Sequence, residues 1–161
     1  MSGSTDRPNV IPWPPLIYGG LALAALASHW IAPLPWPPGG FRWVLAALGL
    51  VAALAALALD ISAALAFRRH RTTIMPNRPA TALVTGGPFA LSRNPIYVAN
   101  TLLVGGLGLV FGIAWLVIAA LLGALLTQKL AIEREERHLA ARFGADWQAY
   151  AAQTPRWLLF R

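Results

Sequence analysis

The residues best suited to chemistry gather in one stretch between apolar blocks, Thr85–Tyr97 (T-G-G-P-F-A-L-S-R-N-P-I-Y). Its glycine pair, Gly86 and Gly87, can adopt positive φ at little cost. Pro88 fixes its own φ and biases the residue before it toward extended backbone. The pattern predicts a stiff, irregular loop that presents backbone N–H groups and Arg93 to a polar, anionic group. An ordinary connector between helices is the alternative interpretation.

A helix is predicted to start at the end of this stretch. Pro95 stands just before the apolar run from Ile96, and proline is favoured in the first turn of a helix. Its ring also biases Asn94 toward extended geometry. A loop that leads into a helix N-terminus is a ready site for a carboxylate or a phosphate.

A second polar group lies in a charged helix predicted over residues 128–142, which ends at Gly144. Glu136 is expected on the apolar, inward-facing stripe of this helix. The residues at −4, +3, +4 and +7 from it are Ile132, Leu139, Ala140 and Phe143. Glu135 flanks it about 100° round the helix. A carboxylate on a buried face needs a cationic or donor-rich partner.

The composition places these groups in a membrane protein. The hydrophobic fraction is 57% and only 12% of residues are charged, against roughly 25% in soluble domains. The net charge is +7, but the arginines cluster at the ends of apolar runs, which indicates membrane topology rather than nucleic-acid binding. There is no cysteine, and the three histidines are far apart in sequence. We therefore expect no disulfide, no thiolate nucleophile and no metal site.

Four apolar runs are predicted to span the membrane: Leu16–Ala32, Trp43–Phe67, Ile96–Phe111 and Ile113–Leu130. The last two form a helical hairpin that turns at Gly112. A G-x-x-x-G pair, Gly108 and Gly112, is expected to allow close helix approach. The loop 68–94 carries five arginines and no acidic residue, so it is predicted to be cytoplasmic, with both termini on the same side.

Four aromatic residues are expected at the membrane surface. Trp13 and Tyr18 are interpreted as interfacial anchors of the first span. Trp147 and Tyr150 belong to a short amphipathic segment after the charged helix, and they are expected to lie on the surface of the bilayer.

Two further carboxylates, Asp60 and Glu133, lie at other positions in the predicted helices. Asp60 lies inside the second span, where a carboxylate faces the bundle interior or a polar cavity. It either pairs with another buried polar group, such as Asn100 or Thr101, or lines a substrate or cofactor cavity. Glu133 and Arg137, at i and i+4, are expected to interact on the solvent side of the charged helix.

Two of these segments together resemble a known superfamily. Residues 87–97, G-P-F-A-L-S-R-N-P-I-Y, resemble the G-P-Y-x-x-x-R-[HN]-P-x-Y segment of the isoprenylcysteine carboxyl methyltransferase and phospholipid methyltransferase superfamily. Residues 135–150, E-E-R-H-L-A-A-R-F-G-A-D-W-Q-A-Y, resemble its E-E-x-x-L-x-x-x-F-G-x-x-[YW]-x-x-Y segment. Pro155-Arg156 resembles its closing P-R, and Thr72–Pro76 the T-T-[VI]-x-P run of its bacterial branch. The likeness covers roughly residues 68–157.

The resemblance implies a methyl donor, S-adenosylmethionine, and a lipophilic acceptor that enters from the bilayer. Carried over by position, the donor site would be lined by Gly86, Gly87, Pro88, Arg93, Asn94, Pro95, Tyr97, Glu135 and Glu136. Arg156 would lie near the acceptor, and Asn94 is the other residue for which a catalytic role is implied. Phe89 replaces the usual Tyr, and Asn94 stands where eukaryotic enzymes have His, so a His-dependent step does not carry over.

Charge complementarity agrees with this implication. A buried Glu suits an ammonium or a ribose diol, while Arg93 and loop amides suit a carboxylate. Methyl transfer needs no metal, and its catalysis is mostly positioning in a dry site.

The sequence thus predicts an all-α membrane protein with about four transmembrane helices, a C-terminal helical hairpin and cytosolic cofactor-binding segments. Residues 1–67 are interpreted as a membrane anchor of two spans and residues 68–161 as the methyltransferase core. The predicted partners are the lipid bilayer and a lipophilic small-molecule or lipid acceptor, with no nucleic acid. The expected location is the cell (inner) membrane. The alternatives are a phospholipid or amine N-methyltransferase of the same superfamily and a non-enzymatic lipid-binding module.

Overall fold

The structure is a computed structural model that describes residues 13–70 and 82–158, and within these ranges its regular secondary structure is entirely helical. The elements are α1 (Trp13–Ile31), α2 (Gly40–Arg69), the short 3₁₀ helix η1 (Gly87–Ala90), α3 (Pro95–Phe111), α4 (Ala114–Thr127), the π-helical turn η2 (Gln128–Ile132) and α5 (Glu133–Gln153). The all-α prediction is confirmed for these ranges. The predicted Thr72–Pro76 motif lies outside the described residues.

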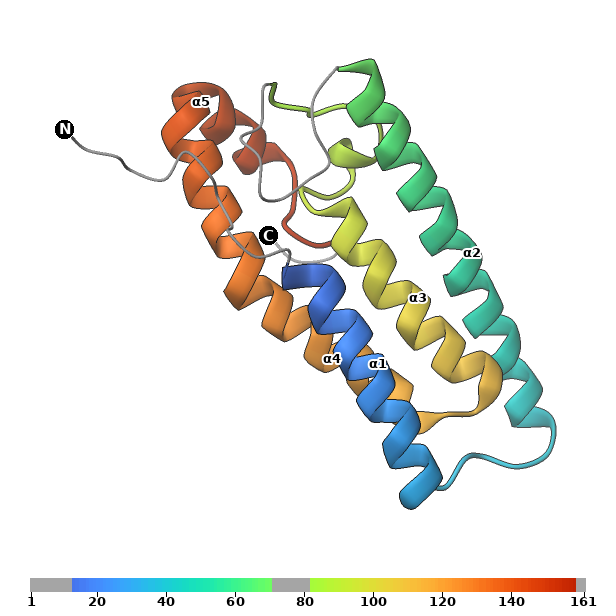
Figure 1. The fold of residues 1–161 in the computed structure, drawn as a ribbon. Helices are drawn as coiled ribbons and strands as arrows, with labels where there is room; N and C mark the ends of the chain where they lie inside the picture. The colour runs from blue at the N-terminus through green and yellow to red at the C-terminus, as the bar shows by residue number, and fades with distance from the viewer. Residues whose placement is uncertain (1–12, 71–81, 159–161) are drawn as a thin grey trace.

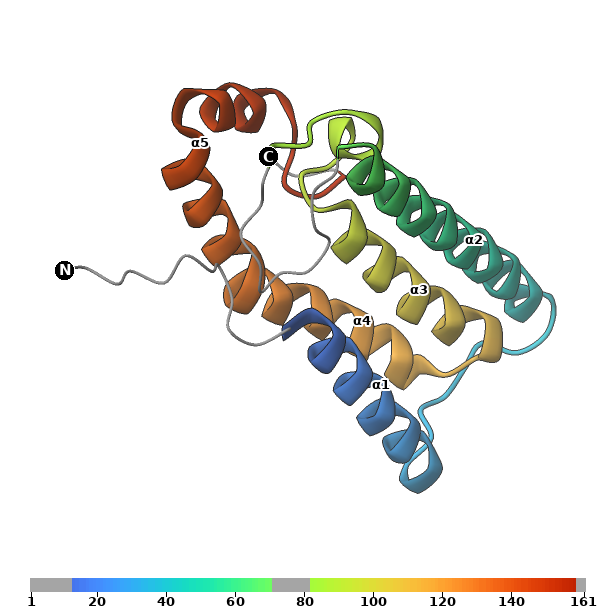
Figure 2. The same cartoon turned by 45° about the horizontal axis from the view of Figure 1, so that its top comes forward.

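The four long apolar helices pack side by side in the order α2, α3, α4, α1 (Figures 1 and 2). The α3–α4 turn lies at one end of this bundle. The loop before α3 and the end of α5 lie at the other end, where α5 continues the line of α4 beyond the bundle. Every segment that was predicted to carry chemistry is therefore at the α5 end.

The outside of the bundle is apolar. On α1, Leu23 is 70% exposed, and on α2, Val51 is 63% exposed. In the described part of the chain, two helical runs are long and apolar enough to cross a membrane by length and composition, Gly40–Arg69 and Ala114–Gln153. Exposed apolar surface on this scale marks an interaction with a membrane or a partner, which fits membrane association. The number of spans and their orientation stay predictions.

Helices α2 and α3 cross where two glycines meet. A Cβ added to Gly49 would lie 2.5 Å from the Gly106 carbonyl oxygen, and one added to Gly106 would lie 2.7 Å from the Gly49 carbonyl oxygen. Gly108 allows α4 to approach α3, as predicted, because its Cβ would lie 3.0 Å from Leu116. Gly112 has another role: with φ 72° it ends α3 in the left-handed conformation. The predicted hairpin and its turn are confirmed.

The chain continues from α4 into α5 and then changes direction within α5. The π-helical turn joins α4 to α5, and Gly144 (φ 51°, ψ −119°) then bends α5, as Figure 2 shows. The predicted stop at Gly144 is thus a bend inside a longer helix. The residues after it fold back toward α2, where Trp147 and Tyr150 are buried with Val84 and Phe89.

Three of the predicted surface anchors are wrong. Trp147 is 6% exposed and Tyr150 8% exposed, so neither can lie on a bilayer surface. Tyr18 is 5% exposed and points into the bundle. Composition identified these residues as amphipathic, but only the packing of α1 and the bend at Gly144 decide which face they occupy. The fourth anchor concerns the Trp13 side chain, which lies outside the described part.

Candidate functional site

The glycine pair before η1 is used at one position only. Gly87 has φ +62°, as the prediction of a tight turn requires, and this places it in the left-handed region even though Pro88 follows. Gly86 has ordinary extended backbone (φ −96°, ψ 171°), so the positive φ that the sequence allows at both glycines is adopted only at Gly87. Both glycines are exposed, with no neighbouring atom within 4 Å of an added Cβ. They form the outer edge of the loop.

The backbone N–H groups from Phe89 to Asn94 do not form an open anion cradle, contrary to the prediction for this loop. Ala90 apart, each of them donates to a protein acceptor. The bonds are Phe89 to the Gly86 carbonyl (3.3 Å), Leu91 and Ser92 to the Pro88 carbonyl (3.1 and 3.2 Å), Arg93 to the Pro155 carbonyl (2.9 Å) and Asn94 to Ser92 Oγ (3.0 Å). An anion would have to compete with these acceptors. The loop is a scaffold that aims side chains.

The segment after α5, residues 154–158, is fastened to this loop; we call it the C-terminal strap. Its Arg156 carbonyl accepts hydrogen bonds from Ser92 Oγ (3.0 Å) and Asn94 Nδ2 (3.1 Å). At its end, Trp157 Nε1 donates to Gln128 Oε1 of the π-helical turn (2.8 Å). The predicted catalytic residue Asn94 is buried. Its side-chain amide donates to the backbone carbonyl of Arg156.

Glu136 forms ion pairs with two arginines from different segments of the chain. The Arg156 Nε and Nη2 donate to its two carboxylate oxygens at 3.1 and 2.5 Å, and Arg93 Nη2 lies 3.4 Å from Oε1. The side chains of Glu136 and Arg93 are 14% and 11% exposed. The hydrogen bonds to Glu136 raise the pKa of the Arg156 guanidinium. The expectation that a carboxylate on this stripe has cationic partners is confirmed.

The Arg93 side chain has one donor atom that the ion pair with Glu136 does not use. Its Nε is buried and has no hydrogen-bond partner among the residues that the structure describes. The guanidinium lies 5.7 Å from the centre of the Trp147 ring, within cation–π range. Buried polar groups in proteins are normally paired, and this unpaired donor lies at the ion-pair cluster around Glu136.

Glu135 faces a different neighbour. Tyr97 Oη donates to both of its carboxylate oxygens, at 2.8 and 3.0 Å. Tyr97 belongs to the first turn of α3, so this contact joins α3 to α5 directly. The adjacent carboxylates Glu135 and Glu136 therefore serve two different contacts, as their angular separation on the helix predicts.

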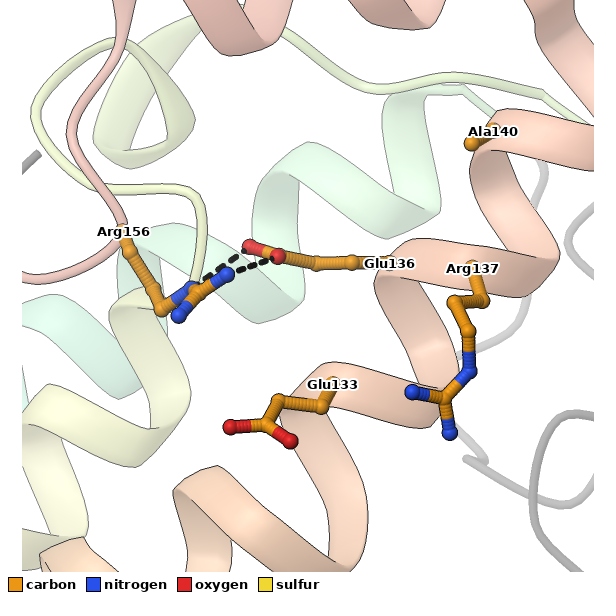
Figure 3. Close-up of a pocket in the computed structure, with 5 residues that line it drawn as sticks. All are labelled: Glu133, Glu136, Arg137, Ala140 and Arg156. Carbon is orange, nitrogen blue, oxygen red and sulfur yellow. Dashed lines mark hydrogen bonds and ion pairs between the residues drawn. The ribbon is translucent and has the colours of Figure 1, made fainter.

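A hollow of about 340 Å³ opens beside the Glu136–Arg156 pair (Figure 3). Its walls are Glu133, Glu136, Arg137, Ala140 and Arg156. The volume is at the small end of the range for ligand sites. In Figure 3 the Arg156 guanidinium and the Glu136 carboxylate point toward each other, while Glu133 and Arg137 extend from the near side of α5. The hollow offers both signs of charge to a zwitterionic ligand.

The predicted site residues do not all meet at this hollow. Glu136 and Arg156 line it, and Arg93 reaches it through Glu136. Tyr97 and Glu135 form the neighbouring contact. Pro88, Asn94 and Pro95 are buried in the scaffold, and Gly86 and Gly87 form its outer edge. The binding and catalytic roles of all of these residues stay predictions.

The two remaining carboxylates of the sequence analysis are Glu133 and Asp60. Glu133 pairs with Lys129, four residues before it, at 2.8 Å; this hydrogen bond lowers the pKa of the Glu133 carboxyl, and the predicted neighbour Arg137 contributes to the same lowering. Asp60 is half-buried with no hydrogen bond or ion pair among the described residues, and the Thr101 hydroxyl is bonded to Tyr18 instead.

Sequence reasoning missed several contacts that build the site. Ser92, which is 1% exposed, bonds the C-terminal strap, and Tyr150 Oη donates to the Phe89 carbonyl at 2.7 Å. Both residues lie within the motif segments and could have been singled out as polar groups beside apolar ones. Nothing local signals the Gln128–Trp157 bond. Among the described residues, no group of three or more His, Cys, Asp or Glu could hold a metal ion.

Comparison with known proteins identifies the family of the chain. Residues 44–146 match the model of a family described as phospholipid methyltransferase. The chain is 35% identical over 114 residues to the nickel-cobalt-cadmium resistance protein NccN of Alcaligenes xylosoxydans xylosoxydans, covering 70% of this chain and 50% of that protein. It is 36% identical over 98 residues to the cobalt-zinc-cadmium resistance protein CzcN of Cupriavidus metallidurans, covering 60% and 44%. The chain spans about half the length of these curated relatives. Because the family match covers well over half of its residues, this chain belongs to the phospholipid methyltransferase family.

Proposed function

We propose that this protein transfers a methyl group from S-adenosylmethionine to a lipophilic acceptor held in the membrane. Membership of a methyltransferase family supports the reaction class. The observation that carries the proposal is Glu136, a nearly buried carboxylate held by Arg93 and Arg156 beside an open hollow. Such a concentration of charge at the end of an apolar bundle is costly unless it serves a polar ligand.

The residues present fit the donor. S-adenosylmethionine carries an α-ammonium, an α-carboxylate and a ribose diol. Glu136 supplies acceptors for an ammonium or a diol at the hollow. Arg137 supplies donors for a carboxylate at the hollow, and Arg93 adds positive charge through its contact with Glu136. When bound, the donor supplies an electrophilic methyl group on a positively charged sulfur.

The contribution of the chain is orientation and exclusion of water. Glu136 is held in one position by two arginines, so it is organised before a ligand arrives. Two of the N–H groups of Arg156 are committed to Glu136, and a guanidinium has five. The remaining N–H groups can meet an acceptor's carboxylate or phosphate at the mouth of the bundle.

We propose four membrane spans, α1 to α4, with both termini in the cytoplasm. Exposed aromatic residues surround the end of the bundle opposite the site, where Trp30 is 87%, Trp43 71% and Phe111 63% exposed. Such residues favour the membrane–water boundary. Reporter fusions at Met1, Gly40 and Arg161 should place only Gly40 outside. A periplasmic C-terminus would contradict the proposal, because the basic loop and the C-terminal strap would then be on opposite sides.

The chemical class of the methyl acceptor is the next part of the proposal. The family description favours a phospholipid or an amine headgroup, while the motif resemblance also fits a carboxylate of isoprenylcysteine type. The names of the two curated relatives refer to metal resistance and specify no methyl acceptor. We propose a membrane-borne nucleophile of small molecule or lipid type, without choosing between O-, N- and S-methylation.

Two measurements on detergent-purified protein test the proposal. Calorimetry with S-adenosylhomocysteine should show one saturable site. Incubation of S-adenosylmethionine labelled in its methyl group with a total membrane lipid extract should move the label into the organic phase, and the labelled product then identifies the acceptor. Binding without transfer to any lipid fraction would leave a donor-binding protein with a non-lipid acceptor. No binding at all would favour a non-enzymatic lipid-binding module.

A further inference from the structure

Tyr18 is a buried polar residue outside the segment that matches the family. It belongs to α1, whereas the family match begins at residue 44. Its side chain is only 5% exposed and faces α3 and α4. A first span that serves only as an anchor has no use for a buried phenol, because a buried hydroxyl must find a partner.

The hydroxyl of Tyr18 is joined to the first turns of α3. Its Oη lies 2.6 Å from Thr101 Oγ1, and Thr101 Oγ1 donates to the Tyr97 carbonyl at 2.9 Å. A threonine hydroxyl has one proton to give, so Tyr18 is the donor to Thr101. Tyr18 Oη also lies 3.5 Å from the same Tyr97 carbonyl. One phenol on α1 therefore holds the backbone of Tyr97 in place.

Helix α4 makes room for this contact with a glycine. A Cβ added to Gly123 would lie 2.6 Å from Cε1 of the Tyr18 ring. The ring therefore packs directly against the backbone of α4, and its position leaves little freedom. This fixes the hydroxyl at one height in the bundle.

The side chain of Tyr97 carries the constraint to the site. Its hydroxyl donates to both oxygens of Glu135, and Glu135 is adjacent to Glu136. Hydrogen bonds of this length weaken within a few tenths of an ångström, so the position of the first turn of α3 determines whether the contact with Glu135 forms. A continuous set of contacts runs from α1 through α3 to α5.

We propose that Tyr18 is a positioning residue of the site: through Thr101 and the Tyr97 backbone it fixes the position of the Tyr97 phenol, which orients Glu135. The inference rests on the proposed function, because it treats Glu135 and its neighbour as part of the donor site. It gives α1 a role in binding in addition to anchoring.

The test is Tyr18→Phe in the full chain, which removes the hydroxyl and keeps the ring against Gly123. Two quantities are measured in detergent: deuterium uptake by the backbone amides of residues 97–101, and affinity for S-adenosylhomocysteine. Exchange in that segment should become about fivefold faster or more, and affinity should fall about fivefold, the effect of one hydrogen bond. Thr101→Val should reproduce both effects.

Trp115→Phe is the matched control. It removes another hydrogen bond between α1 and its neighbours, from Trp115 Nε1 to the Ala32 carbonyl (2.8 Å), at the opposite end of the bundle. Both quantities should stay within about twofold of wild type, since one lost hydrogen bond acts only where it is made.

Each result decides something. Wild-type exchange in Tyr18→Phe would overturn the inference, and so would faster exchange with unchanged affinity, which would make Tyr18 merely structural. Wild-type protein that binds no S-adenosylhomocysteine would instead overturn the proposed function, and the site role of Tyr18 with it. Equal losses in Tyr18→Phe and Trp115→Phe would also reject a specific positioning role.

Discussion

The two ends of this bundle are held together by different forces. Toward the α3–α4 turn, helices approach through glycines: Gly49 of α2 lies against Gly106 of α3, and Gly108 of α3 lies against Leu116 of α4. At the other end, the loop before α3, the C-terminal strap and α5 are joined by side-chain hydrogen bonds and ion pairs that centre on Glu136.

The difference separates stability from function. Apolar contacts between backbones provide no recognition chemistry, but in a bilayer close packing of small residues is what holds helices together. Charged contacts at the site end are costly to bury, so their value lies in arranging ligand-binding groups. Substitutions at the first end should unfold the protein, and substitutions at the second should change binding more than stability.

Gly106→Val should have the largest effect. Its Cβ would lie 2.7 Å from the Gly49 carbonyl oxygen and 3.1 Å from the Ala53 nitrogen, and neither backbone atom can move aside. Overpacking of this kind costs about 3 kcal/mol or more when backbone must shift. We expect loss of the monodisperse peak in size-exclusion chromatography in detergent, with a lower thermal unfolding midpoint for any folded fraction.

Gly20→Val is the control for that comparison. Gly20 lies within α1, and nothing lies within 4 Å of an added Cβ. This variant should elute and unfold like wild type. If both variants aggregate equally, helix approach at Gly106 is not what holds the bundle together.

Glu136→Ala should have the next largest effect, and on binding. The change leaves two buried or half-buried guanidiniums without their carboxylate. Removing one partner of such a contact costs on the order of 2–5 kcal/mol. Affinity for S-adenosylhomocysteine should therefore fall by tens of fold or more in calorimetry, while the helical circular dichroism signal persists.

Glu133→Ala tests whether the burial of a carboxylate, rather than its proximity to the hollow, determines its effect on donor affinity. Glu133 lines the same hollow, but its ion-pair partner Lys129 is 70% exposed, and exposed pairs contribute little. Its affinity should stay within about threefold of wild type. Small and equal losses for both variants would show that Glu136 faces water.

Arg156→Lys should have an intermediate effect. Lysine keeps the charge, but it loses the two-pronged contact that Nε and Nη2 make with Glu136. We expect donor affinity to fall about tenfold, as one charged hydrogen bond is lost, and kcat to fall further if Arg156 also meets the acceptor. Turnover and affinity like those of wild type would remove Arg156 from the site and leave it a headgroup contact.

Tyr150→Phe should have the smallest effect, and mainly on stability. The hydroxyl donates to the Phe89 carbonyl, and the ring packs in the cluster beneath the loop. The loss of one buried hydrogen bond should lower the free energy of unfolding by about 1 kcal/mol. Urea or thermal unfolding in detergent measures it. A binding loss as large as that of Glu136→Ala would show that the loop depends on this one bond.

Local sequence was enough for the elements and for the identity of the polar residues. Apolar runs and the Gly112 turn gave the hairpin, because helix length and a left-handed glycine are local properties. The stripe around Glu136 placed its carboxylate inward, since the 3.6-residue period is also local. The expected cationic partner followed from the cost of a buried charge.

Only the tertiary structure decided which partners meet. Nothing in the order of residues pairs Glu136 with Arg93 and Arg156, or joins the C-terminal strap to the loop, because these contacts join segments that are far apart in the sequence. The bend at Gly144 buries Trp147 and Tyr150 where an amphipathic pattern predicts a membrane surface. Tyr18 is likewise buried because Gly123 of α4 lies against its ring. An aromatic residue suits an interface and a core equally well by composition, and the neighbouring helix makes the choice.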